Sequence, residues 1–198
     1  MDSLIFELFW FIVFLAVFIH SIKSFKSTRN TLLFFIPAII WSFGVELAGV
    51  HIWFMYEYSS TFYYLLWGVP ISIAFGWATL QYIGYQISVH FSKRLSMRID
   101  LESAILPTVI DIIILEPIAY LFKFWIWKYN NFWFGAPLFN FIGWFLIISL
   151  YLICYQWVTL KFPDYKKRVA YFLVVLLCAF VVLLTIAFVY LTVFGGFF

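Results

Sequence analysis

The acidic side chains within apolar stretches of about 20 residues include Glu46, Asp111 and Glu116. Ionisable groups in such stretches cost free energy and mark functional sites by default. A carboxyl group in apolar surroundings resists ionisation, and a second carboxylate nearby strengthens this effect. One carboxyl group can then stay protonated near neutral pH and act as a general acid, while an ionised neighbour holds a water molecule or accepts its proton. We therefore predict that Glu46, Asp111 and Glu116 are catalytic.

Polar and aromatic residues near these carboxyl groups are candidates for substrate binding. His51 and Glu57 follow Glu46 in an aromatic segment, and Asn140 stands near the start of a later apolar stretch. The faces of aromatic rings stabilise a cation by roughly 2 kcal/mol or more when water is excluded. An acid, a base, such rings and an apolar slot together suit proton-initiated chemistry on an isoprenoid double bond. The predicted substrate-binding residues are His51, Glu57, Trp67, Trp77, Asn140 and Trp144.

Other interpretations of these residues stay open at the level of the sequence. A buried carboxyl group can simply hydrogen-bond across helices, with Asn140 as its partner. A small proton-coupled transporter or a lipid-binding membrane protein would also place carboxylates in the membrane. A metal site is disfavoured, because no pair of histidines has ligand spacing. Neither Cys154 nor Cys178 has a neighbouring base in the sequence, so a cysteine nucleophile lacks support. We expect no metal.

The composition is that of an integral membrane protein. Apolar residues make up 66% of the 198 residues and charged residues only 11%, and the mean hydropathy is +1.04. A soluble domain is about 45–50% apolar and about 25% charged, so a water-soluble enzyme or secreted module is excluded. Basic residues form short clusters between apolar runs, which argues against nucleic acid as a partner. The expected surroundings are the lipids of the cell membrane.

Six apolar stretches are long enough to cross a bilayer core of about 30 Å, which needs roughly 20 helical residues. A β-barrel would instead show short alternating strands. The first stretch lacks a basic leading region and a small-residue cleavage site, so we expect a lasting helix and not a signal peptide. The chain is therefore predicted to be an all-α integral membrane protein with about six transmembrane helices in a single domain, residues 1–198. The predicted spans are 3–22, 31–50, 68–89, 101–121, 137–158 and 169–194.

The basic residues predict how these spans are oriented. Apart from Lys123 and Lys128, every lysine and arginine lies in the loops after the first, third and fifth spans or at their edges. By the positive-inside rule these loops are cytoplasmic, and both termini and the other two loops face outward. The two outer loops are rich in aromatic residues, which fits an interfacial belt or a roof over a cavity for an apolar ligand. The basic residues of the three cytoplasmic loops are Lys23, Lys26, Arg29, Lys93, Arg94, Arg98, Lys161, Lys166, Lys167 and Arg168.

A short pattern occurs twice, at the start of the third span and of the fifth. In both copies a Gly-Trp pair follows a proline by the same interval. Proline suits the first turn of a helix, and the later glycine permits close approach of a neighbouring helix. The preceding spans carry Glu46 and Glu116, so we predict a parallel internal repeat of two-helix units, spans 2–3 and 4–5. The copies are Gly68-Val-Pro70 with Gly76-Trp77, and Gly135-Ala-Pro137 with Gly143-Trp144.

These segments resemble those of the carotenoid biosynthesis membrane proteins. The resemblance covers approximately residues 40–150. The family includes the bisanhydrobacterioruberin hydratases of archaea and the related carotenoid 1′-hydratases of bacteria. The matching segments are Phe43-Gly-Val-Glu46-Leu-Ala-Gly49-Val-His51, Trp67-Gly-Val-Pro70, Gly76-Trp77, Asp111 with Leu115-Glu116-Pro117, and Gly135-Ala-Pro137-Leu-Phe-Asn140-Phe-Ile-Gly143-Trp144.

The resemblance implies a carotenoid hydratase that adds water to the terminal double bond of an acyclic carotenoid or related isoprenoid lipid. Protonation there gives a tertiary cation, water captures it as a tertiary alcohol, and no cofactor is needed. Carried over position by position, Glu46, Asp111, Glu116 and Asn140 would form the polar site. One position departs from the family's pattern, which has aspartate before the proline where Glu116 stands. Glu7, near the outer end of the first span and outside the repeat, is expected to be a neutral control position.

Overall fold

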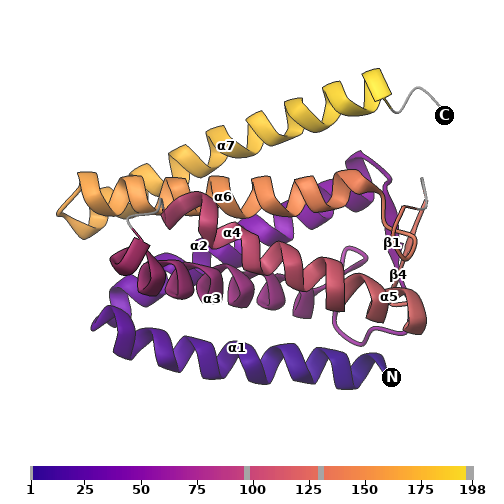
Figure 1. Cartoon of the computed structure of the whole chain (residues 1–198), viewed down its shortest axis with the longest axis horizontal. Helices are drawn as coiled ribbons and strands as arrows, with labels where there is room; N and C mark the ends of the chain where they lie inside the picture. The colour runs from indigo at the N-terminus through magenta and orange to yellow at the C-terminus, as the bar shows by residue number, and fades with distance from the viewer. Residues whose placement is uncertain (1, 96–98, 129–131, 195–198) are drawn as a thin grey trace.

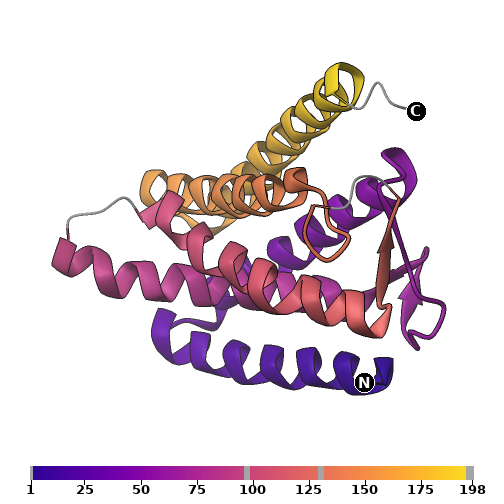
Figure 2. The same cartoon turned by 45° about the vertical axis from the view of Figure 1, so that its right-hand side comes forward.

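The computed structural model describes residues 2–95, 99–128 and 132–194 as a bundle of helices with a small β ribbon at one end (Figures 1 and 2). The elements are α1 (Ser3–Phe25), α2 (Thr28–Leu47), the π-helical turn η1 (Ala48–Ile52), β1 (Tyr56–Tyr58), β2 (Leu65–Leu66), β3 (Val69–Pro70), α3 (Ile71–Leu95), α4 (Ile99–Ile110), the π-helical turn η2 (Asp111–Leu115), α5 (Glu116–Phe122), β4 (Trp125–Trp127), α6 (Leu138–Lys161) and α7 (Tyr165–Phe194).

Polar side chains cap the N-terminal ends of the first two helices. The Asp2 side chain accepts the backbone N–H of Leu4 at 3.0 Å at the start of α1. The helix ends at Phe25, and the next residue, Lys26, has a φ of 52° that reverses the chain. Ser27 then caps α2 by accepting the N–H of Asn30 at 3.3 Å. Such caps satisfy N–H groups that the first turn of a helix leaves unpaired.

The prediction of an all-α membrane protein is confirmed. Within the described residues, five helical segments are long and apolar enough to cross a membrane: α1, α2 with η1, α4 from Leu101 through α5, α6 and α7. The third predicted span, 68–89, corresponds to the 25-residue helix α3, which is less apolar than these five. Helix α3 packs against α1, α2 and α4, and Gln81 is buried there with its amide 3.2 Å from the Ser42 hydroxyl. Because its neighbours shield it from lipid, α3 can carry such polar residues.

Aromatic side chains fill much of the core between α2 and α6. Phe34 and Tyr151 are fully buried, and the ring of Phe34 meets those of Tyr151 and Tyr155 edge to face. The Tyr151 hydroxyl donates to the carbonyl oxygen of Phe34, which gives the buried phenol a partner. These contacts account for part of the unusually high aromatic content.

The two ends of the bundle differ in character. The N-terminal end of α1, the C-terminal end of α7, helix α5 and the strands β1 and β4 lie at one end (Figure 1). The α1–α2 turn and the α6–α7 connection lie at the other, and they carry the basic residues of two of the three predicted cytoplasmic loops. Arg98 of the remaining loop lies outside the described residues. The direction in which the bundle crosses the membrane stays a prediction of the positive-inside rule.

The internal repeat is visible in the backbone. Trp67 and Gly68 both have positive φ, 50° and 75°, as do Phe134 and Gly135, at 46° and 86°. Each pair forms a two-residue turn between paired residues, Leu66↔Val69 in one half and a bridge between Trp133 and Ala136 in the other. Two consecutive positive φ values are the signature of the type I′ hairpin turn. In both halves this turn leads through a proline into a long helix.

Candidate functional site

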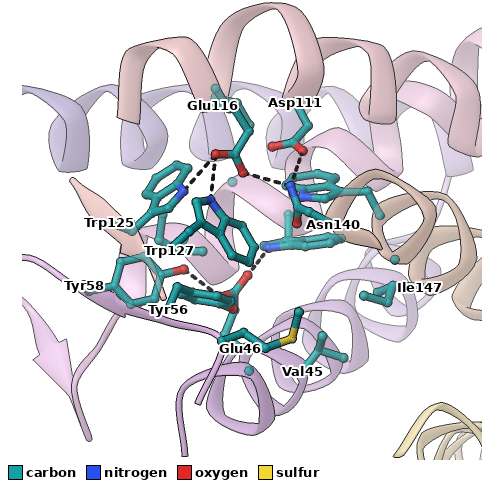
Figure 3. A pocket seen from close by; sticks show the side chains of 18 of the residues that line it. Val45, Glu46, Tyr56, Tyr58, Asp111, Glu116, Trp125, Trp127, Asn140 and Ile147 are labelled. Carbon is teal, nitrogen blue, oxygen red and sulfur yellow. Dashed lines mark hydrogen bonds between the residues drawn. The ribbon is translucent and has the colours of Figure 1, made fainter. Parts of the chain in front are cut away.

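A cavity of about 90 Å³ lies at the end of the bundle that carries the β ribbon. Glu46 of α2, Asp111 of η2 and Glu116 of α5 all line it, together with Trp77 and Asn140. The side chains of Glu46, Asp111, Glu116 and Asn140 converge in Figure 3. The carboxyl groups are well buried, at 5%, 1% and 2% exposure. We call this space the carboxyl cavity.

Glu46 is surrounded by hydrogen-bond donors. The hydroxyls of Tyr56 and Tyr58 donate to its Oε2 at 2.5 and 2.6 Å. The indole N–H of Trp77 donates to its Oε1 at 2.6 Å. Every one of these donors favours the ionised form of the carboxyl group, since a carboxylate is a pure acceptor.

Glu116 has a matching environment in the second half of the chain. The indole N–H groups of Trp125 and Trp127 donate to its Oε2 at 3.2 and 3.0 Å. The Asn140 amide donates to its Oε1 at 2.8 Å. Both glutamates thus receive three donors, two of them from a neighbouring strand.

The β ribbon, formed by β1 and β4, places these donors. The strands run antiparallel, with Tyr56 opposite Trp127 and Tyr58 opposite Trp125. Alternate side chains of a strand share a face, so all four aromatic rings point to the carboxyl cavity. Glu57 lies between the two tyrosines on the opposite face and pairs with Lys128 at 3.2 Å, close to water.

Gly49 leaves room for one of these donors, the hydroxyl of Tyr56. A Cβ atom on Gly49 would lie 2.5 Å from the hydroxyl oxygen of Tyr56. No side chain fits there without moving the tyrosine. Gly49 thus lets Tyr56 approach Glu46 across the η1 turn.

The two tyrosines of the ribbon stay protonated. Burial raises the pKa of Tyr56 and of Tyr58 well above the usual value, and the negative charge of Glu46 raises both pKa values further. The phenol groups are therefore neutral donors at physiological pH, as their bonds to Glu46 require.

Asp111 differs from the two glutamates. Its Oδ2 accepts the Asn140 amide at 3.0 Å. Its Oδ1 is buried and has no hydrogen-bond partner among the described residues. One Asn140 nitrogen thus donates to both Asp111 and Glu116, one N–H to each.

The η2 turn explains how Asp111 and Glu116 face the same side chain. Residues five apart in a regular α-helix, with 3.6 residues per turn, point about 140° away from each other. In η2 the backbone N–H of Glu116 bonds to the carbonyl of Asp111, which is the i→i+5 pattern of a π turn. This wider turn brings both carboxyl groups to one side of the helix.

Two stacked tryptophans connect the halves of the repeat at the cavity. The rings of Trp77 and Trp144 have centroids 3.7 Å apart and planes inclined by 10°. These are the tryptophans of the two Gly-Trp pairs. A Cβ atom on Gly76 would come within 3.0 Å of Trp10, whereas one on Gly143 would meet nothing within 4 Å. Gly143 therefore borders open space where it lines the cavity.

Three predicted binding residues lie away from the cavity. His51 is exposed, and its Nε2–H donates to the Trp67 carbonyl oxygen at 2.7 Å. The Trp67 side chain is 70% exposed. Glu57 is turned outward by strand alternation. The structure therefore brings together Glu46, Asp111, Glu116, Trp77, Asn140 and Trp144, but not His51, Glu57 and Trp67.

The expectation that Glu7 is a neutral position is corrected. Its side chain is only 3% exposed, and its two oxygens accept the backbone N–H groups of Tyr63 and Tyr64, each at 3.0 Å. Glu7 thus anchors the aromatic loop to α1. A substitution there would disturb the loop next to the carboxyl cavity.

Some residues that line the cavity are not among the site residues predicted from the sequence. Tyr56, Tyr58, Trp125 and Trp127 counted only as members of aromatic loops, although Tyr-Glu-Tyr and Trp-Ile-Trp alternate as strand residues do. Phe6 and Trp10 of α1 also line the cavity, and no sequence signal pointed to them. In the part of the chain that the structure describes, no group of three or more His, Cys, Asp or Glu side chains could hold a metal ion.

A family model described as "carotenoid biosynthesis protein" matches residues 5–197. No curated protein and no solved structure matches the chain at a significant level. The family match extends well beyond the residues 40–150 on which the sequence resemblance rests. It includes α1, which contributes Phe6 and Trp10 to the carboxyl cavity.

Proposed function

The chain belongs to the carotenoid biosynthesis protein family, and from this membership we propose that it adds water to the terminal double bond of an acyclic carotenoid. Membership in this family implies a role in carotenoid biosynthesis and an isoprenoid lipid as substrate. The observation that supports hydration is the group of three buried carboxyl groups around one small cavity in a helical membrane protein.

The size of the carboxyl cavity suits one end of the substrate. Its volume is about 90 Å³, and one water molecule needs about 10–15 Å³. This space suffices for the branched end of an isoprenoid chain with one water molecule, but not for a whole carotenoid. Val45 and Ile147 lie on the side of the cavity away from Trp125 and Tyr58 (Figure 3). The rest of the polyene would leave there, between α2 and α6.

The chemistry needs a proton, a stabilised cation and a water molecule. Protonation of the less substituted carbon of the terminal double bond leaves a tertiary cation on the other. Carboxylates and aromatic faces stabilise that positive charge where bulk water is excluded. Water then attacks the cation and loses a proton to a carboxylate, which gives a tertiary alcohol. No redox partner enters this balance.

Expression in a host that accumulates lycopene or bisanhydrobacterioruberin tests the proposal. We expect products heavier by one or two water molecules. The visible spectrum should stay unchanged, because the isolated terminal bond lies outside the polyene. A variant combining Glu46→Gln, Asp111→Asn and Glu116→Gln should accumulate in the membrane and leave the pigments unhydrated.

Two results would contradict the proposal. Unchanged pigments with several acyclic carotenoids, at normal protein levels, would favour a small proton-coupled transporter or a lipid-binding protein. Hydration by the triple variant would show that these carboxyl groups are not the source of the proton.

A further inference from the structure

The three carboxyl groups of the cavity differ in their hydrogen-bond environment. Glu46 and Glu116 each accept three donors that occupy both oxygens. Among the described residues, Asp111 accepts a single donor, on Oδ2. The difference is large because an ionised carboxylate has about four acceptor positions to satisfy.

This difference in donors favours one charge state for the two glutamates and another for Asp111. Donors aimed at a carboxyl group favour its anion, so the three donors around Glu46 and the three around Glu116 favour the carboxylate form of each. A buried carboxylate with one unpaired oxygen lacks hydrogen bonds that would offset the free-energy cost of burying its charge. Asp111 avoids this cost when Oδ1 carries a proton, because a carboxylic acid needs fewer donors.

The free oxygen of Asp111 is also correctly placed. Asp111 lines the carboxyl cavity, and Asn140 holds it beside Glu116 through its two N–H groups. Oδ1 has no partner among the residues that the structure describes, so a proton on it is not engaged by the protein.

We propose that Asp111 donates the proton of the hydration through Oδ1, while Glu46 and Glu116 remain ionised and stabilise the cation. The assignment rests on the proposed function and gives each of its three carboxyl groups a separate role. Asn140 is the positioning residue that keeps acid and carboxylate side by side.

The proposed step balances in atoms and charge. The Oδ1–H bond of Asp111 breaks as the π electrons of the terminal double bond form a new C–H bond. This leaves an Asp111 carboxylate and a tertiary carbocation flanked by the carboxylates of Glu46 and Glu116. The oxygen of a water molecule forms the C–O bond. One water proton goes to the Asp111 carboxylate, so the acid is restored in each cycle.

Infrared spectroscopy of the purified protein at neutral pH tests the charge assignment without substrate. A protonated carboxylic acid has a C=O stretching band that a carboxylate lacks. We expect this band in the wild type and its loss in Asp111→Asn. Glu46→Gln and Glu116→Gln should retain it. Glu102→Gln is the matched control, because Glu102 belongs to the same helical segment as Asp111 and does not line the cavity.

Pigment analysis in a carotenoid-producing host tests the donor role itself. Asp111→Asn should lower hydration by about 10²–10⁴-fold, which is the usual contribution of a general acid. Glu46→Gln and Glu116→Gln should lower it less, since the acid remains. Asp111→Glu keeps an acid one methylene further out and should retain both the infrared band and part of the activity, even if Asp111→Asn fails to accumulate.

The possible failures are distinguishable. If the wild type hydrates carotenoids and Asp111→Asn does so at more than a tenth of its rate, the donor assignment is overturned and the proposed function survives. Persistence of the band in Asp111→Asn, with its loss in Glu46→Gln or Glu116→Gln, also overturns the assignment. If the wild type hydrates no acyclic carotenoid, both proposals fall.

Discussion

Hydrogen-bond donors, rather than the acidic side chains alone, distinguish the residues of the carboxyl cavity. Glu46 and Glu116 have the same residue type and occupy corresponding ends of the two halves. The first half supplies tyrosine hydroxyls to Glu46, and the second supplies tryptophan N–H groups to Glu116. A tyrosine can lose its proton at high pH, whereas an indole N–H cannot. Glu46 alone therefore depends on donors that titrate.

This dependence predicts a loss of stability at alkaline pH. The pKa of Tyr56 and Tyr58 is raised in the folded protein, whereas an unfolded tyrosine ionises near pH 10. Above about pH 10, loss of the tyrosine proton therefore stabilises the unfolded chain but not the folded protein. The free energy of unfolding should fall by about 1.4 kcal/mol per pH unit for each tyrosine, with no effect of these groups well below pH 10.

Denaturant unfolding in detergent at several alkaline pH values measures this slope. A Tyr56→Phe/Tyr58→Phe double variant is the comparison, because it keeps both rings and every other titrating group. Its unfolding free energy should be lower at neutral pH and should fall less steeply above pH 10. Equal slopes in the two proteins would contradict the prediction.

At the scale of elements, irregular backbone shapes the cavity. Turn η1 follows Glu46, and η2 separates Asp111 from Glu116. Single π turns inside α-helices are rare and occur frequently at functional sites. Both lie at the end of the bundle where the β ribbon covers the carboxyl groups. The ribbon in turn depends on the close approach that Gly49 permits.

An alanine substitution should have different effects at two glycines that line the cavity, Gly49 and Gly143. Gly49→Ala places a Cβ atom 2.5 Å from the Tyr56 hydroxyl, so it should lower the free energy of unfolding by about 1–3 kcal/mol and reduce hydration. Gly143→Ala meets nothing within 4 Å and should leave stability unchanged. Gly143→Leu should fill the cavity and reduce hydration at near-normal stability.

Thermal unfolding and pigment analysis of the three glycine variants provide the measurement. The contrast between Gly49→Ala and Gly143→Ala is the internal control, because both add one methyl group beside the same cavity. Full activity in Gly143→Leu would show that the substrate does not occupy the space next to α6.

At the scale of the whole molecule, the carboxyl cavity lies between the two halves of the repeat. The strands β1 and β4 pair across it, and Trp77 stacks on Trp144 beside it. Asp111, Glu116 and Asn140 come from one half and Glu46 from the other. The complete set of groups thus exists only when both halves pack together. The position of this cavity relative to the membrane depends on the orientation of the bundle.

Thiol labelling in intact cells tests that orientation. Ser60 and Thr28 are exposed polar residues at opposite ends of the bundle. In a variant without Cys154 and Cys178, a cysteine at Ser60 should react with an impermeant reagent. One at Thr28 should be protected until the cells are broken. The reverse labelling would place the carboxyl cavity in the cytoplasmic half of the membrane.

The sequence by itself determined the class of the protein and most of its polar site. Hydropathy is a sum over neighbouring residues, so the long helices could be predicted without tertiary contacts. Glu46, Asp111, Glu116 and Asn140 stood out because polar groups are costly in apolar segments. The repeated Gly-Trp pattern pointed to the two tryptophans that stack.

Only the tertiary structure decided which polar groups meet and how. The pairing of β1 with β4 joins segments about 70 residues apart in the chain, and no local pattern specifies that register. It turns Tyr56 and Tyr58 toward Glu46 and leaves Glu57 outside. The η2 turn brings Asp111 and Glu116 to one side, where the regular period of a helix would separate them. Hydropathy and residue type depend on the chain alone, whereas the donors around each carboxyl group depend on long-range packing.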